Sequence, residues 1–125
     1  MEALGKNVCV DTSTIIEFIK GRDKKFIGAL EDGRKICTTS ICAFELSLRK
    51  TNIEVVEHFL GRVSVLPFDD LSAKIASNLI KSLKEKGKTM EIRDLFIAAI
   101  CIRNSFELLT ENRKHFEHIK ELKLA

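Results

Sequence analysis

The sequence contains no tryptophan and no tyrosine, and its 6% aromatic content consists of eight phenylalanines. Domains that bind single-stranded nucleic acid without sequence preference commonly stack the bases on exposed aromatic side chains. This chain is poorly supplied with such side chains. We therefore do not expect a stacking platform to be the basis of its function.

Paired cysteine motifs and long apolar runs are also absent. The four cysteines lie in apolar segments, and no two of them are separated by two residues: Cys9, Cys37, Cys42 and Cys101. Their spacing does not match a structural zinc site and favours core residues of a reduced intracellular protein. No run approaches the ~20 apolar residues that span a bilayer, and residues 1–7 are too short and polar for a signal peptide. We therefore expect a cytoplasmic protein without a membrane segment.

A strong net charge is missing as well. The 21 basic and 18 acidic residues leave a formal charge of +3, which permits an RNA or DNA partner without requiring one. With 125 residues, 45% of them hydrophobic, the chain can bury one core. We therefore predict a single domain over residues 1–125.

Short strand-like runs alternate with helical segments along the chain. Strands are predicted at 8–10, 35–40, 63–67, 107–110 and 122–124. Helices are predicted from a hydroxyl cap at 12–14 to Gly21, and at 23–32, 41–50, 53–60, 69–86, 94–104 and 113–119. The clearest helical period is that of Leu71, Ile75, Leu79 and Leu83, which recur every four residues. This alternation predicts a three-layer α/β fold with a parallel sheet.

Acidic and amide side chains follow several of the predicted strands. Asp11 directly follows the first strand, Glu45 lies in the first turns after the second, and Glu111 and Asn112 follow 107–110. Asp94 begins a helix that must run antiparallel to the next strand, so it lies at the same edge of the sheet. Functional residues of open parallel sheets gather at this edge. We therefore expect Asp11, Glu45, Asp94 and Asn112 to converge.

Three carboxylates in one place repel one another, which raises the pKa of at least one unless a positive group lies among them. Mg²⁺ is a suitable partner, because it takes oxygen ligands and keeps waters that substrate phosphates can replace. One ion can activate water, and a second can stabilise a leaving oxygen. The hydroxyls of Thr12, Ser13 and Thr110 would then orient the carboxylates or a metal-bound water.

A purely structural interpretation explains some of these residues. An aspartate after a strand is commonly a helix cap, and Asp94 at a helix N-terminus is also favoured by the helix dipole. Glu45 is different, because it interrupts the apolar stretch CAFELSL. A carboxylate there is costly unless it meets a cation or lines a cleft. Glu45 therefore favours a functional cluster over isolated caps.

Four segments of the chain occur in an order typical of a known family. They are VDTSTIIEFIKG, SICAFELSLRK, VLPFDDLSAKIASNLIKSLKEKGKTMEIRDLFIAAI and LLTENRKHFEHI. In this order they resemble the PIN-domain ribonucleases, and most of all the small VapC-type toxins of prokaryotic toxin–antitoxin pairs. The resemblance covers nearly the whole chain and implies a parallel five-stranded sheet flanked by helices.

The resemblance also implies a role for each candidate site residue. Asp11, Glu45 and Asp94 would be catalytic metal ligands, and Ser13 would assist Asp11. Asn112 stands at the fourth acidic position and departs from the full set of acids, although its amide oxygen can still hold a metal-bound water. The implied activity is Mg²⁺- or Mn²⁺-dependent endonucleolytic cleavage of RNA.

Partners are implied by the resemblance as well. They are an RNA substrate, an antitoxin that inserts an apolar segment into a groove and often presents a basic side chain to the acids, and a second copy in a homodimer. Basic residues beside the motifs are candidate RNA contacts, namely Arg49, Lys50, Arg93 and Arg113. Apolar positions of the groove would include Ile16, Phe18, Ile19, Leu46 and Leu48. His115 is predicted to stay on the surface of the last helix.

Three other classes of protein share some of these features. A phosphatase of the haloacid-dehalogenase type also begins with an aspartate after a strand, but it needs a second aspartate two residues later, where this chain has Ser13. A receiver-like phosphoacceptor would need an acidic pair at the first strand, which is not evident. The third alternative is a catalytically inactive PIN-like domain that binds RNA or protein, which the amide at Asn112 allows.

Overall fold

Four strands and seven helical segments form residues 7–125, which the computed structural model describes. The strands are β1 (Asn7–Val10), β2 (Lys35–Thr39), β3 (Ser64–Leu66) and β4 (Glu107–Leu109). The helices are α1 (Thr12–Ile19), α2 (Lys25–Glu31), α3 (Ser40–Ser47), α4 (Ile53–Leu60), α5 (Asp70–Glu85), α6 (Ile92–Asn104) and the 3-10 helix η1 (Arg113–His115). Residues 1–6 lie outside the described residues. They include most of segment 1–7, which is too short and polar for a signal peptide.

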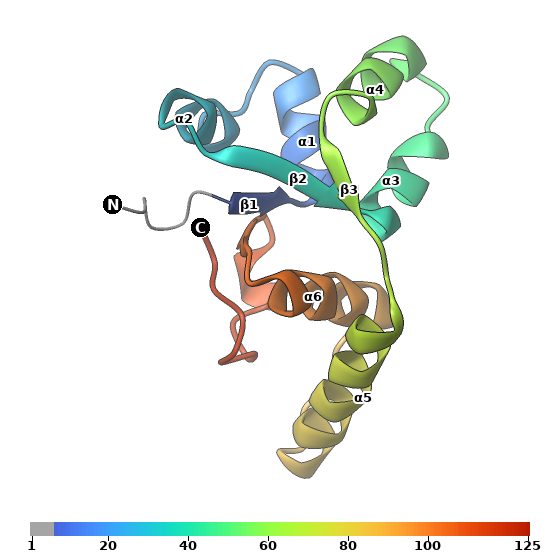
Figure 1. Ribbon diagram of the computed structural model, residues 1–125, viewed down its shortest axis with the longest axis vertical. Coiled ribbons are helices and arrows are strands. Elements are labelled where there is room, and N and C mark those ends of the chain that lie inside the picture. Colours follow the sequence, from blue (N-terminus) through green and yellow to red (C-terminus); the bar gives the residue numbers. More distant parts are fainter. Residues whose placement is uncertain (1–6) are drawn as a thin grey trace.

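The sheet is parallel throughout, with the strand order β3-β2-β1-β4. Figure 1 shows α1, α2 and α4 over one face of the sheet, and α5 and α6 over the other. The predicted three-layer α/β fold with a parallel sheet is therefore confirmed. No helix within residues 7–125 is both long and apolar enough to cross a bilayer.

Side chains of β1 alternate between two hydrophobic cores, as the two-residue period of a strand requires. Val8 and Val10 pack on the side of α1 and α2, whereas Cys9 packs on the side of α5 and α6. The centre of α6 is buried all round, with 97–101 completely inaccessible. All four cysteines are buried and free, so their predicted place in the core is confirmed.

Polar caps start three helices. Asp11 caps α1 by accepting a hydrogen bond from Thr12 N (2.7 Å), Thr39 caps α3, and Asp69 caps α5. The hydroxyls at 12–14 were predicted to cap the first helix, which is wrong, because Asp11 holds that position. Since β1 and β2 end immediately before α1 and α3, the first two caps lie at the carboxyl end of the sheet.

The last segment of the chain differs from its prediction. Within 122–124 only Leu124 forms a bridge, to Leu108, held by Leu108 N to Lys123 O (2.9 Å) and Ala125 N to Leu108 O (2.8 Å). A single bridge does not make a strand, so the described sheet has four strands and the prediction of five was wrong. Residues 113–119, predicted as an α-helix, form the 3-10 helix η1 followed by turns. Their backbone N–H groups donate to the carbonyl three residues earlier, whereas those of an α-helix donate to the carbonyl four residues earlier.

Candidate active site

Three carboxylates from three different elements meet at the carboxyl end of the sheet. Asp11 follows β1, Glu45 lies on α3, and Asp94 lies in the first turn of α6. The side chains of Asp11 and Asp94 are 0% and 4% exposed, and that of Glu45 is 28% exposed. The parallel topology accounts for this meeting, since it brings strand ends and the start of α6 to one edge.

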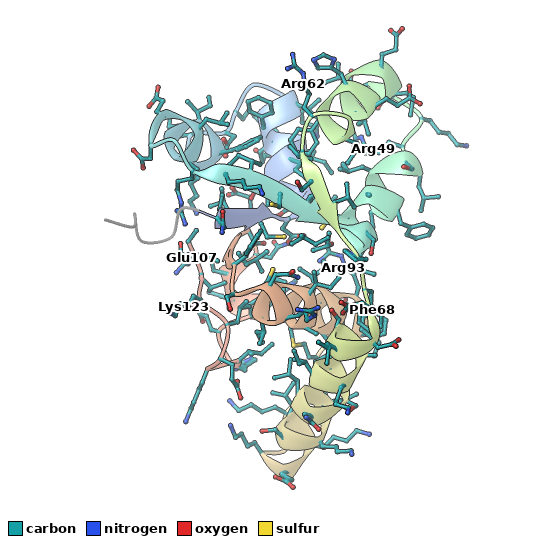
Figure 2. The ribbon with its side chains drawn as sticks, in the orientation of Figure 1. Arg49, Arg62, Phe68, Arg93, Glu107 and Lys123 are labelled. Carbon is teal, nitrogen blue, oxygen red and sulfur yellow. The ribbon has the colours of Figure 1, made fainter. Side chains whose placement is uncertain are left out.

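Arg93 joins the three carboxylates. Its Nη2 donates to Asp11 Oδ1 (2.8 Å) and Glu45 Oε1 (2.8 Å), its Nε donates to Glu45 Oε2 (2.6 Å), and its Nη1 donates to Asp94 Oδ1 (2.6 Å). Figure 2 shows the Arg93 side chain in the space between the sheet and α6. We call Asp11, Glu45, Arg93 and Asp94 the rim cluster. The predicted convergence of the three acids is thus what the structure shows.

Electrostatic compensation in the rim cluster is strong but incomplete. Partial burial opposes the ionisation of Glu45, but hydrogen bonds from Arg93 and Thr12 outweigh it and lower the pKa of Glu45. Partial burial also opposes the charge of Arg93, but hydrogen bonds and charges of the surrounding acids outweigh it and raise the pKa of Arg93. One guanidinium among three carboxylates leaves two formal negative charges, so Arg93 compensates the acids only in part.

Hydroxyl groups hold two of the carboxylates independently of Arg93. Thr12 Oγ1 donates to Glu45 Oε1 (2.7 Å), and Thr110 Oγ1 donates to Asp11 Oδ2 (2.7 Å). The hydroxyl of Ser13 lies 3.4 Å from Thr110 Oγ1 and accepts from Glu111 N (3.1 Å). The predicted supporting hydroxyls therefore surround the cluster, with Thr110 in direct contact and Ser13 one step away.

A buried thiol also contacts the cluster. Cys42 Sγ donates to Asp11 Oδ1 at 3.6 Å. Burial first, and the neighbouring Asp11 second, raise the pKa of the Cys42 thiol. The group therefore stays protonated at neutral pH and acts as a neutral donor to Asp11.

Asp94 connects the rim cluster to a histidine on the surface. Its Oδ2 lies 3.2 Å from Nδ1 of His115, whose side chain is 56% exposed. A cavity of about 230 Å³ opens beside the two residues and is lined further by 89–91, Lys114 and His118. His115 is on the surface, as the sequence predicted, and it also contacts a rim residue, which was not predicted.

The structure does not bring Asn112 into the cluster. Asn112 is exposed, and no hydrogen bond within the described part of the chain joins its side chain to Asp11, Glu45 or Asp94. Its backbone N donates to Thr110 Oγ1 (3.0 Å), so its link to the acids is indirect. The neighbouring Glu111 turns away, because its Oε2 accepts from Thr14 Oγ1 (3.4 Å).

The four candidate RNA contacts lie in different surroundings. Arg93 belongs to the rim cluster instead of an open surface, and Figure 2 shows Arg49 well apart from it, beside the upper helices. Lys50 is exposed in the turn after α3. Arg113 is exposed and donates to Ala125 O (2.6 Å). None of these positions by itself identifies an RNA path.

An apolar groove of about 720 Å³ lies away from the rim cluster. Its lining comes from α1, α2, β2 and α4 and includes Phe18, Phe26, Leu30, Ile36, Val55 and Phe59. Of the apolar residues proposed for a groove, Phe18 lies there. Leu46 is fully buried, Ile16 and Ile19 pack against the core, and Leu48 is exposed on another surface.

The three acids of the rim cluster offer carboxylate oxygens, which are the type of ligand that a hard divalent cation prefers. Their present spacing does not fit one: among residues 7–125 no three acidic, histidine or cysteine side chains are placed to hold a metal ion. The guanidinium of Arg93 fills the space between them. The sequence did not predict this role of Arg93, although its position beside Asp94 was a usable signal.

Comparison with known sequences gives consistent relatives. The model of the PIN domain family matches residues 8–122. Ribonuclease VapC3 of Methanocaldococcus jannaschii is 37% identical over 94 residues, which are 73% of this chain and 94% of that protein. Ribonuclease VapC2 of Haemophilus influenzae is 28% identical over 122 residues, covering 91% and 92% of the two chains.

Comparison with solved structures gives the same fold. DNA-bound VapBC from Salmonella typhimurium superposes with a TM-score of 0.83 at 24% identity, covering 95% of this chain and 96% of that one. VapBC-1 from nontypeable Haemophilus influenzae superposes with a TM-score of 0.81 at 25% identity, with the same coverage.

Proposed function

Because this chain belongs to the PIN-domain family, we propose that it is an endoribonuclease that cleaves RNA phosphodiesters with Mg²⁺ or Mn²⁺ at the rim cluster. The observation that carries the proposal is the convergence of Asp11, Glu45 and Asp94 around the guanidinium of Arg93. The ribonuclease names of the curated relatives support the same activity. The family match over residues 8–122 supports our proposal that residues 1–125 form one domain.

The chemistry follows from the donor set. A bound Mg²⁺ or Mn²⁺ would activate water and stabilise charge on the scissile phosphate. Asp11, Glu45 and Asp94 would hold the metal ion. Its positive charge would offset the negative charge of the three acids, which otherwise repels a phosphodiester. Thr12 and Thr110 keep Glu45 and Asp11 oriented through their hydroxyl groups. Asn112 would act at the fourth position, through water, from its place next to Thr110.

A toxin of a toxin–antitoxin pair is the biological role that we propose for this nuclease. Among the structural relatives, those from Salmonella typhimurium and Haemophilus influenzae are described as VapBC. The apolar groove beside α1, α2 and α4 supports an antitoxin partner, because it would take an inserted apolar segment. The exposed Arg113 and Lys50 are available to guide RNA, and Arg49 is a further candidate.

Two other properties belong to this proposal. We propose a homodimer, supported by Phe44 of α3 and Leu48 directly after it, which are both 64% exposed. We propose a cytoplasmic location, where the four free cysteines would remain reduced. Light scattering of the purified chain tests the first, and fractionation of cells that produce it tests the second.

The experiment that tests the activity uses the chain purified without any antitoxin. We expect it to cut RNA with Mn²⁺ or Mg²⁺, to stop in EDTA, and to resume when excess metal is added. Asp11→Asn, which keeps a good helix cap, should lose at least about a hundredfold in rate, because a metal ligand is lost. The matched control is Asp70→Asn, an exposed carboxylate at the start of α5.

Each contrary result has a definite meaning. Cutting that survives EDTA, or that Asp11→Asn leaves undiminished, would contradict a metal-dependent site at the rim cluster. RNA binding without cutting would favour the catalytically inactive PIN-like alternative. Hydrolysis of a small phosphomonoester, with RNA left intact, would favour the phosphatase alternative.

A further inference from the structure

We propose that Arg93 is an internal counter-ion that occupies the metal position in the metal-free protein, so that binding of a divalent cation requires Arg93 to leave the cluster. This inference rests on the proposed function, because it concerns the same carboxylates. It adds that Arg93, a residue of the chain itself, controls metal binding at the site.

The first argument is the geometry of the contacts. Arg93 uses Nε, Nη1 and Nη2 to bind oxygens of Asp11, Glu45 and Asp94 at 2.6–2.8 Å. A planar guanidinium between three carboxylates keeps them too far apart to share one small ion, and the described chain holds no group with metal-binding spacing. The contacts of Arg93 and those of a metal ion therefore exclude each other.

The second argument is that the acids remain in place without Arg93. Asp11 is held by Thr12 N and Thr110 Oγ1, both at 2.7 Å, and Glu45 is held by Thr12 Oγ1 at 2.7 Å. Asp94 keeps its contact with His115. These bonds come from groups other than Arg93, so removal of the guanidinium would leave an arranged site.

The third argument is that Arg93 can move. Its side chain is 26% exposed, whereas those of Asp11 and Asp94 are 0% and 4% exposed. A long side chain near the start of a helix can turn into solvent without a change of the backbone. The charge of the cluster also favours exchange, because one positive charge replaced by two removes more of the repulsion between the acids.

The test compares Arg93→Gln with Arg103→Gln, a change of the same kind at the other end of α6, where Arg103 pairs with Asp69. Mn²⁺ affinity is measured by calorimetry without RNA. We expect Arg93→Gln to bind Mn²⁺ about tenfold more tightly than the unmodified protein, since it no longer pays for displacing the arginine. Arg103→Gln should leave the affinity unchanged.

Thermal melting gives a second readout that does not depend on activity. In EDTA, Arg93→Gln should melt about 5 °C lower, because two buried acids and the partly buried Glu45 lose their cation. Mn²⁺ should raise its melting temperature more than that of the unmodified protein, as tighter binding to the folded state requires. Arg103→Gln should show neither effect.

Arg93→Lys keeps the inference testable if Arg93→Gln does not fold. Lysine retains the charge but cannot bind three carboxylates with a planar fork. The Mn²⁺ affinity of Arg93→Lys should therefore lie between that of the unmodified protein and that of Arg93→Gln. An unchanged or weaker Mn²⁺ affinity in both rim variants, or no Mn²⁺ binding at all, would overturn the inference. Failure of the proposed function is distinct: RNA would stay uncut although Arg93→Gln binds Mn²⁺ more tightly.

Discussion

The two ends of α6 each carry an arginine, and their surroundings differ. Near the start, Arg93 binds Glu45 of α3, Asp94 of α6 and Asp11, which directly follows β1. Near the end, Arg103 donates to Asp69 Oδ2 (3.1 Å), and Asp69 Oδ1 accepts from the backbone N and the hydroxyl of Ser72. We call Asp69, Ser72 and Arg103 the distal cluster. It involves only neighbouring turns of α5 and α6, which pack against each other.

The difference separates a structural arrangement from the site of the proposed function. The distal cluster caps α5 and pairs two exposed side chains, a type of contact that adds little to stability. The rim cluster concentrates like charges where two of the three acids are buried, which costs folding free energy unless a cation compensates. The proposed metal binding would account for such an arrangement.

The largest expected contrast is between Asp94→Asn and Asp69→Asn. Asp94→Asn should remain folded and lose at least about a hundredfold in RNA cleavage, because a metal ligand is removed. Asp69→Asn should cut at the normal rate, since asparagine still caps a helix. Initial cleavage rates with Mn²⁺, together with circular dichroism, measure both. Equal activity of the two variants would remove the distinction between the clusters.

Removal of a supporting hydroxyl should have a smaller effect. Thr110→Val deletes the donor to Asp11 Oδ2, and we expect about tenfold weaker Mn²⁺ binding because the ligand is less well oriented. Ser72→Ala deletes the matching hydroxyl donor to Asp69 Oδ1 and should not change Mn²⁺ binding. Calorimetry on both proteins decides the matter, and identical affinities would show that Thr110 has no part in the site.

Much of this comparison could be predicted from the sequence. The strand and helix periods predict the parallel three-layer fold, and the topology then predicts that Asp11, Glu45 and Asp94 meet. The role of Arg93 could not be predicted in the same way, because the direction of a long side chain depends on packing that the sequence pattern does not show. The same limit applies to the single bridge at Leu124, where local period alone favoured a full strand.

Asn112→Asp should have an effect smaller still. A fourth carboxylate near Thr110 adds negative charge at the rim, so we expect Mn²⁺ affinity to rise by on the order of threefold while cleavage is retained. The measurement is calorimetry beside a cleavage assay, with Glu111→Asp as a control at the neighbouring position that turns away. A collapse of cleavage in Asn112→Asp would show that the fourth position has been assigned to the wrong residue.

The smallest effect concerns the distal cluster and appears only in stability. Hydrogen bonds from Ser72 backbone and hydroxyl, and then Arg103, lower the pKa of Asp69. A lowered pKa in the folded state means that Asp69 stabilises the protein above its unfolded pKa of about 3.9 and loses this contribution as the pH falls. The melting-temperature difference between the unmodified protein and Asp69→Asn should therefore shrink between pH 7 and pH 3. A constant difference would contradict this assignment.

The most direct test of the rim cluster is a crystal structure with Mn²⁺, using anomalous scattering to locate the ion. We predict a peak between Asp11, Glu45 and Asp94 at about 2.0–2.2 Å from their carboxylate oxygens, with the Arg93 guanidinium displaced from these three acids. A peak elsewhere, or an undisturbed Arg93 in a metal-saturated crystal, would contradict the account.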